Sequence, residues 1–311
     1  MILLRRYGTL LALALIVLVF TIASPNAFGS MSNLVNITQQ MALLAIVAIG
    51  ATLVMVLGEF DLSVSAVVSW AGIAAAALFA AGIAVPIVMI VVLVSAVAMG
   101  AISGFLVARY KVPSFIATLA FGTVIGGLTF WVSNGATLFS GIPAGFRDLG
   151  RGTLAGVPVP TLWLIGVAVV FWLLLDQTEF GRRLYAIGGN REAACLVGLP
   201  VRRDMVVAFA LCAALAGLAG LLLTARLGSA HPTGGGGYLL QAYAAVFLGM
   251  TAFREGEPSV PGTLVGAAII AVVSNGLTIL GVPSFLQDLL TGAIILAAVL
   301  VRNFGRDEAA A

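Results

Sequence analysis

The sequence predicts an all-α polytopic membrane protein of about ten transmembrane helices, built as two inverted-repeat halves with both termini in the cytoplasm. Hydrophobic residues make up 61% of the 311 residues, well above the roughly 45–50% of an ordinary soluble domain. The apolar residues fall in runs close to the roughly 20 residues that one bilayer-spanning helix needs. Ten such helices leave room only for connecting loops, so we expect residues 1–311 to form a single transmembrane domain.

Apolar runs between polar, proline or glycine residues define the spans. We expect them near residues 8–24, 40–57, 64–82, 86–108, 114–133, 161–176, 204–224, 239–252, 260–280 and 284–301. The first run follows Arg5 and Arg6 and precedes Pro25, which resembles a secretory signal. Its length and the spans that follow favour an uncleaved first helix.

The basic residues support this count and set the orientation. With ten spans and a cytoplasmic N-terminus, twelve of the fifteen basic residues fall inside the cell, as the positive-inside rule requires. The three outside are Arg147, Arg151 and Arg226; the twelve inside are Arg5, Arg6, Arg109, Lys111, Arg182, Arg183, Arg191, Arg202, Arg203, Arg254, Arg302 and Arg306. Removing one span would invert every later loop and destroy the pattern.

Two short sequences recur in the second half of the chain. Residues 112–115, Val-Pro-Ser-Phe, return at 282–285, and the Val-Pro pair at 85–86 returns at 260–261. In the ten-span interpretation the two copies begin on opposite sides of the membrane, as in an inverted repeat of the kind common in transporters. The halves would run from about 40 to 133 and from about 204 to 301.

Few residues could support enzyme chemistry. Lys111 is the only lysine and lies between Tyr110 and Val112, which excludes a Walker A site. His231 is the only histidine, and Cys195 and Cys212 are too far apart for a metal-binding motif. We therefore expect no catalytic residue, no metal, no cofactor and no nucleic-acid partner.

Two carboxylates follow the second predicted span, in a segment that contains Gly58, Glu59, Asp61 and Ser63. A carboxylate at mid-bilayer costs about 2.5–3.5 kcal/mol on insertion scales, so it should face a cavity or a polar partner. Asp61 could line a translocation pathway at a broken helix, or it could cap the following helix by accepting backbone N–H bonds. Both interpretations remain open from the sequence.

Residues 177–203 form the largest polar interruption, a predicted cytoplasmic loop with a short helix. Asn190 is a suitable N-cap, Glu192 lies in the first turn, and Gly198 and Pro200 end the helix after a small apolar face at 193–197. A helix of about two turns is marginal alone and needs a packing partner. The loop is therefore either an ordinary basic loop or a docking element.

Glycine-rich segments predict close packing and a second interruption. The pairs at 100/104, 122/126 and 262/266 have GxxxG spacing, which favours packing within the chain over a seam between subunits. Gly234 to Gly237 predict a flexible or broken connection between the seventh and eighth spans.

Taken together, these segments resemble the permease subunits of ribose-type bacterial ABC importers, which move pentoses, hexoses and related carbohydrates. The resemblance covers nearly the whole chain. It is carried by Gly58 with Asp61-Leu62-Ser63, by residues 115–119, by residues 185–190 with Ala193 and Gly198, by residues 225–227 with Pro232 and 237–238, and by Gly262, Thr263, Gly266, residues 275–277 and Gly292.

The resemblance implies a non-catalytic, multi-pass subunit of the bacterial inner membrane that acts as a dimer with a second copy or a paralogue. A periplasmic sugar-binding protein would deliver substrate, and a separate ABC ATPase would dock on the loop as on a coupling helix. The residues implied for ATPase coupling are Gly188, Gly189, Asn190, Glu192, Ala193 and Gly198; those implied for the translocation pathway are Gly58, Glu59, Asp61 and Ser63.

This chain departs from the family pattern at three positions. Glu59 and Ser65 stand where glycines are usual, and Gly126 stands where many members have arginine. The added charge of Glu59 would disfavour an anionic substrate and suit a neutral sugar or polyol.

Two other functional classes fit the span count. An ion-driven secondary transporter would also show ten spans and an inverted repeat, but Glu59, Asp61 and Asp288 are its only candidate proton carriers. A membrane scaffold protein would show no transport.

Overall fold

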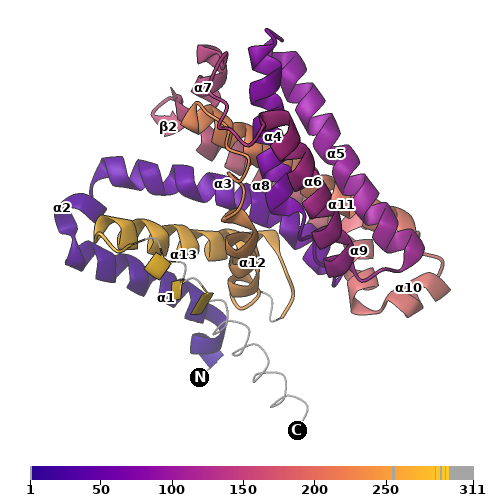
Figure 1. The fold of residues 1–311 in the computed structure, drawn as a ribbon. Helices are drawn as coiled ribbons and strands as arrows, with labels where there is room; N and C mark the ends of the chain where they lie inside the picture. Colours follow the sequence, from indigo (N-terminus) through magenta and orange to yellow (C-terminus); the bar gives the residue numbers. More distant parts are fainter. Residues whose placement is uncertain (1, 254–255, 284, 288, 291, 294–311) are drawn as a thin grey trace.

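The computed structural model describes residues 2–253, 256–283, 285–287, 289–290 and 292–293, and nearly all its regular structure is helical (Figure 1). The helices are α1 (Ile2–Ala23), α2 (Pro25–Phe28), α3 (Met31–Val56), α4 (Val64–Ala80), α5 (Val85–Tyr110), α6 (Ser114–Ser133), α7 (Ala144–Arg151), α8 (Val159–Gln177), α9 (Glu179–Gly189), α10 (Arg191–Leu196), α11 (Val201–Leu227), α12 (Tyr238–Gly249) and α13 (Val260–Ile279). The strands β1 (Thr153–Leu154) and β2 (Val157–Pro158) form an antiparallel hairpin.

The first nine predicted spans coincide with helices. Within the described residues, α3, α5, α6, α8, α11 and α13 are long and apolar enough to cross a membrane, while α4, α12 and the part of α1 from residue 9 are shorter apolar helices. The helices α2, α7 and α9 and the hairpin are elements that the sequence analysis did not predict. The tenth span lies mostly outside the described residues, as do Arg254, Asp288, Arg302 and Arg306.

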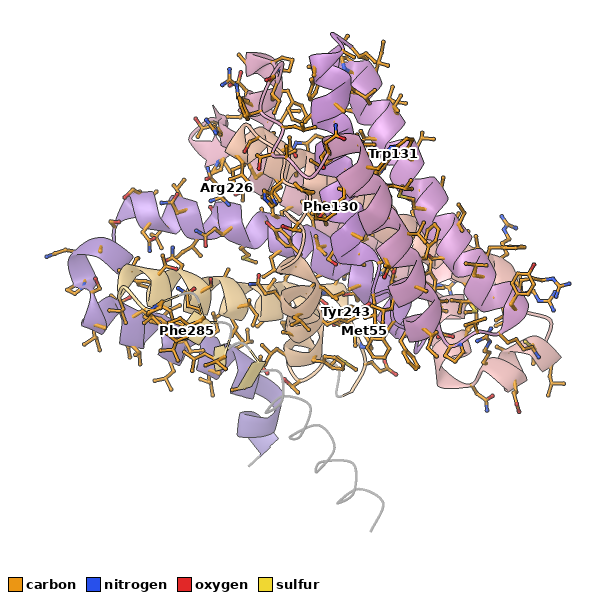
Figure 2. The ribbon with its side chains drawn as sticks, viewed as in Figure 1. Met55, Phe130, Trp131, Arg226, Tyr243 and Phe285 are labelled. Carbon is orange, nitrogen blue, oxygen red and sulfur yellow. The ribbon has the colours of Figure 1, made fainter. Side chains whose placement is uncertain are left out.

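The core is organised around α3 and α11. Every residue from 42 to 57 is buried, so the second half of α3 is covered on all sides, as expected of a uniformly apolar helix at the centre of a membrane protein. The helix α11 packs against α3, α4 and α5. In contrast, α6 exposes large apolar side chains, including Phe130 and Trp131, which are labelled in Figure 2.

Two of the three GxxxG pairs pack within the chain, as predicted. A Cβ on Gly100 or Gly104 would meet α11 at Phe209, and a Cβ on Gly262 or Gly266 would meet the backbone of α12. The remaining pair differs, because Gly122 lies against Ser63 while a Cβ on Gly126 would meet no atom within 4 Å. Missing side chains therefore let α5 and α13 approach their neighbours closely.

The same order of elements occurs twice. In the first half, α3 is followed by an interruption at residues 57–63, the short helix α4 and then α5; in the second, α11 is followed by an interruption at 228–237, the short helix α12 and then α13. Val85 and Val260, which begin the recurring Val-Pro pairs, are the first residues of α5 and α13. We call residues 57–63 the first break and residues 228–237 the second break.

Apart from α2, which joins α1 to α3, the elements outside the apolar helices gather in two places. In Figure 1, α7 and β2 lie at the top of the view, and α9 and α10 lie at the lower right. The helix α8 follows the hairpin directly and leads into α9 through Thr178. The helix α8, which is long and apolar enough to cross a membrane, therefore separates the two groups along the chain.

Candidate functional site

The first break is held by side chains from two other helices. Gly58 adopts a φ of 76° and turns the chain out of α3, a conformation that glycine adopts without steric cost. The next backbone N–H groups donate in turn to side chains: Phe60 to Ser114 Oγ at 3.1 Å, Asp61 to the Tyr243 hydroxyl at 2.7 Å, and Leu62 to Thr118 Oγ1 at 2.9 Å.

Tyr243 binds this break twice. Its hydroxyl accepts from the backbone N–H of Asp61 and donates to the backbone carbonyl of Asp61 at 3.1 Å. The residue projects from α12, in the second half of the chain (Figure 2). Because buried backbone groups need partners, this one hydroxyl satisfies a donor and an acceptor that the interrupted helix leaves unpaired.

The Asp61 side chain is buried and stabilises the turn before α4. Its Oδ1 accepts from the backbone N–H of Ser63 at 2.9 Å and from Ser63 Oγ at 2.6 Å. Ser63 precedes the first residue of α4 and makes no capping bond with its own side chain. Asp61 therefore bonds just outside the helix rather than to an N–H within its first turn.

The second break is held mainly through the backbone. Ala230 and Leu138 exchange backbone hydrogen bonds of 2.7 and 2.9 Å, and the N–H of Gly235 donates to Ser69 Oγ at 2.9 Å. A Cβ on Gly235 would collide with the carbonyl oxygen of Ser65. A glycine is therefore needed where this break crosses α4.

The two breaks are secured in a reciprocal way. Ser69 is the sixth residue of α4 and bonds the second break, while Tyr243 is the sixth residue of α12 and bonds the first. Each half thus contributes the short helix that fixes the break in the other half.

The helix α9 is anchored on three parts of the membrane domain. Arg183 Nε donates to Asp204 Oδ2 at 2.7 Å, and Asp204 is buried in the first turn of α11. The bond with the Asp204 carboxylate raises the pKa of Arg183 further above its ordinary value. The Tyr185 hydroxyl donates to the carbonyl of Pro258, just before α13, and Gly188 lies so close to the end of α3 that a Cβ would collide with the carbonyl oxygen of Val56.

The helix α10 has the cap and limits expected from the sequence. Asn190 Oδ1 accepts from the N–H of Ala193 at 2.9 Å, Glu192 lies in the first turn, and Gly198 follows the helix with a φ of 81°. Leu196 and Val197 are 88% and 75% exposed. These two neighbouring side chains place an exposed apolar pair at the end of an otherwise polar loop.

An ion pair joins α10 to the first break. Arg191 Nη1 lies 3.1 Å from Glu59 Oε1, and the Glu59 side chain is only 19% exposed. The negative charge of Glu59 is therefore partly compensated within the chain by Arg191, which weakens its expected effect on an anionic substrate.

Several features of this site were missed by sequence reasoning. Thr178 precedes α9 as its N-cap and accepts from the N–H of Gly181, so this threonine was an available helix-start signal. Arg191 was counted only as an inside charge. Thr118 lies within residues 115–119, which carry the resemblance, but no local pattern signals that Thr118 and Tyr243 bond to the first break. Both bonds depend on helices that meet in space.

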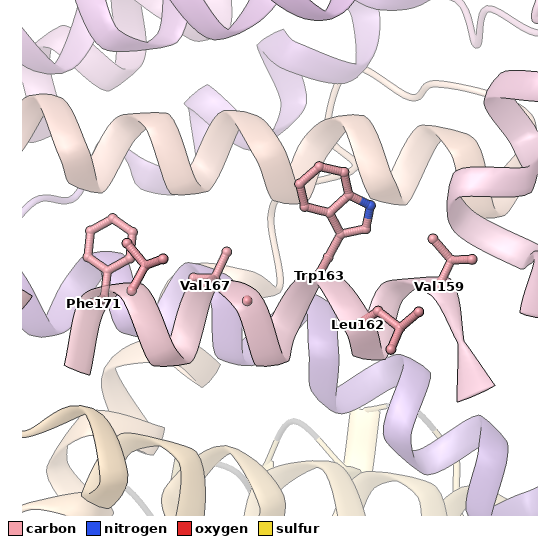
Figure 3. A pocket seen from close by; sticks show the side chains of 7 residues that line it. Val159, Leu162, Trp163, Val167 and Phe171 are labelled. Carbon is pink, nitrogen blue, oxygen red and sulfur yellow. The ribbon is translucent and has the colours of Figure 1, made fainter. Parts of the chain in front are cut away.

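The remaining features offer little for ligand chemistry. The pocket in Figure 3 is lined only by α8, with Trp163, Val167 and Phe171 among its apolar residues, so it lacks the polar groups that would orient a sugar. Among the residues that the structure describes, no group of three or more His, Cys, Asp or Glu side chains could hold a metal ion. Cys195 and Cys212 are free, and His231 is exposed.

Comparison with known proteins gives one family and several curated relatives. Residues 33–299 match the family described as branched-chain amino acid transport system, permease component. The chain is 39% identical to the ribose import permease RbsC of Bacillus subtilis (strain 168), over 96% of this chain and 92% of that protein. It is 33% identical to the D-allose transport system permease AlsC of Escherichia coli (strain K12), covering 94% and 90%, and 34% identical to the L-arabinose permease AraH of Azospirillum brasilense, covering 98% and 90%. No solved structure matches the chain.

Proposed function

Because the chain belongs to the family of branched-chain amino acid transport system permease components, we propose that it is the membrane-spanning permease of an ABC importer for a neutral sugar. The relatives carry the names of ribose, allose and arabinose permeases, which supports a carbohydrate rather than an amino acid. As such a permease, the chain is a multi-pass protein of the bacterial inner membrane.

The observation that carries the proposal is the arrangement of α9 and α10. The loop is anchored on α11 through Arg183 and against the end of α3 through Gly188, yet it leaves Leu196 and Val197 exposed. A rigidly mounted loop with an exposed apolar tip suits a permanent partner that pushes on the helices beneath it. We assign that partner as the ABC ATPase, which would hydrolyse ATP on a separate subunit.

The proposed assembly follows from the charges and the recurring order of elements. Ten spans with both termini inside would place α9 and α10 in the cytoplasm and α7 with its hairpin outside, where a periplasmic binding protein would dock. The two halves would be inverted repeats, and the permease would pair with a second copy or a paralogue. This arrangement gives an alternating-access pathway in which the two breaks face a polar route.

The function is tested by uptake measurements in liposomes. The chain is purified with its ATPase, binding protein is added, and uptake of radiolabelled D-ribose, D-allose and L-arabinose is measured with internal ATP or with an imposed proton gradient. ATP-dependent uptake that persists after ionophores collapse all gradients is the expected result. Uptake by the isolated chain that follows the gradient would instead establish a secondary transporter, and no uptake under either condition would favour a scaffold.

Docking is tested with an exposed residue whose change should not disturb folding. Leu196→Asp should weaken ATPase association about tenfold, the scale of losing one interface anchor, because it would place a charge in an apolar contact. Glu192→Arg should act in the same direction. The matched control is Leu154→Asp, an exposed leucine on β1. Equal co-purification of ATPase with all three variants and the unchanged protein would contradict the docking surface.

A further inference from the structure

The ion pair between Glu59 and Arg191 is the direct charged link between the α9–α10 loop and the first break. The two residues are 132 positions apart, and their charged atoms lie 3.1 Å apart. Glu59 is 19% exposed and Arg191 is 41% exposed. The pair is thus partly shielded from water, where a charge interaction is stronger than at a fully exposed surface.

Neither charge is favourable for its own element. Arg191 is the first residue of α10, where the positive end of the helix dipole repels a cation, and Asn190 already supplies the cap. Glu59 follows the buried end of α3, where an uncompensated carboxylate would be costly. The pairing lowers both of these unfavourable contributions, so each charge gives a physical reason for the other.

A displacement at Glu59 would reach the rest of the break through adjacent residues. Phe60 and Leu62 are bonded to α6, and Asp61 between them is bonded to Tyr243 of α12. The phenyl ring of Phe60 also packs against Tyr243, with ring centroids 5.4 Å apart. The first break is therefore a junction at which α10, α6 and α12 act on four consecutive residues, 59–62.

We propose that the Glu59–Arg191 ion pair transmits movement of α10 to the first break and so couples the ATPase cycle to opening of the translocation pathway. The proposal rests on the proposed function, because it takes α10 as the ATPase-docking helix. Both residues act as positioning residues in this proposal, because their effect on transport passes through the backbone of the first break. The absence of a side chain at Gly188 lets α9 lie against the end of α3. The Glu59–Arg191 ion pair adds a charged connection from the next helix, α10.

The test is a charge-reversal cycle in the reconstituted complex. Glu59→Arg and Arg191→Glu are made singly and together, and sugar uptake per ATP hydrolysed is measured with D-ribose, D-allose and L-arabinose in the presence of binding protein. Each single reversal should lower this ratio about tenfold, within the usual range of coupling between two sites, with ATPase co-purification retained. The double reversal should restore at least about half of the ratio, since it re-forms the pair in the opposite sense.

Controls separate this inference from its premise. Arg109→Glu reverses an exposed basic residue of α5 outside the loop and should leave the ratio unchanged. If a single reversal prevents assembly, Glu59→Gln and Arg191→Gln replace it and should lower the ratio in the same direction. Single variants with an unchanged ratio, or a double variant no better than the singles, overturn the coupling role alone. Absence of ATP-dependent uptake in the unchanged complex overturns the proposed function together with this inference.

Discussion

The two breaks occupy equivalent places in the order of elements, yet they are held by different chemistry. The first break contains Glu59 and Asp61, and three of its consecutive N–H groups donate to side chains of α6 and α12. The second break contains no Asp, Glu, Lys or Arg and is held by a backbone bridge to Leu138 and by one serine of α4. Only the first touches the α9–α10 loop through an ion pair.

This difference suggests that the two breaks have different roles, although they occupy equivalent places in the order of elements. Side-chain hydrogen bonds and ion pairs can be exchanged one at a time as helices rotate. The second break instead pairs through its backbone with Leu138, and its glycines let it pass close to α4. The first break is thus suited to responding to a signal from the loop. The second break, which pairs with the segment that leads into α7, is suited to holding a constant shape.

The largest expected effect comes from loosening the loop that contacts the first break. Arg183→Ala leaves Asp204 buried without its guanidinium and should reduce stability by about 3 kcal/mol, the lower end for breaking a buried pair because Arg183 is 29% exposed. Thermal unfolding in detergent, followed by intrinsic fluorescence, measures this effect. Glu179→Ala is the control: its carboxylate is 82% exposed and 3.9 Å from Arg183, so a change under about 0.5 kcal/mol is expected. Similar losses in both variants would show that the Asp204 bond does not anchor α9.

Smaller effects, which differ between the two positions, are expected at two neighbouring glycines. Gly188→Ala should destabilise the protein by about 1–3 kcal/mol, because the new Cβ would collide with the carbonyl oxygen of Val56. Gly189→Ala meets no atom within 4 Å, so the higher helix propensity of alanine should leave stability unchanged or raise it by up to about 1 kcal/mol. The same unfolding measurement compares the two. A neutral Gly188→Ala would mean that α9 does not rest closely on α3.

The contrast between the breaks also explains what the sequence could and could not predict. Apolar run length located nine helices, and Asn190 with Gly198 located α10, because these signals act within a few residues. Gly58 and Asp61 marked the first break because glycine and a carboxylate are costly inside an apolar helix. The Val-Pro pairs at the starts of α5 and α13 were likewise local signals.

Contacts between segments that are distant in the sequence could not be predicted from these local signals. Tyr243 and Ser69 are unremarkable within their apolar helices, and their roles appear only when α12 and α4 cross the opposite breaks. Arg191 looked like an ordinary inside charge until it met Glu59. Side-chain pairing over more than 100 residues depends on the packing of whole helices, which periodicity and charge counting do not determine.

Effects of about 1–2 kcal/mol should come from removing the reciprocal hydroxyl bonds, and they compare the two breaks directly. Tyr243→Phe leaves the buried N–H and carbonyl of Asp61 without this partner and should cost about 2 kcal/mol; Ser69→Ala removes one bond to Gly235 and should cost about 1 kcal/mol. Both changes preserve the packing volume nearly intact, so the loss reflects hydrogen bonding. Thermal unfolding in detergent measures the loss of stability, and sugar uptake per ATP hydrolysed measures how well ATP hydrolysis is coupled to transport. If the first break alone responds to α10, Tyr243→Phe should lower uptake per ATP while Ser69→Ala lowers stability only; an equal loss of uptake per ATP in both variants would show that the two breaks move together.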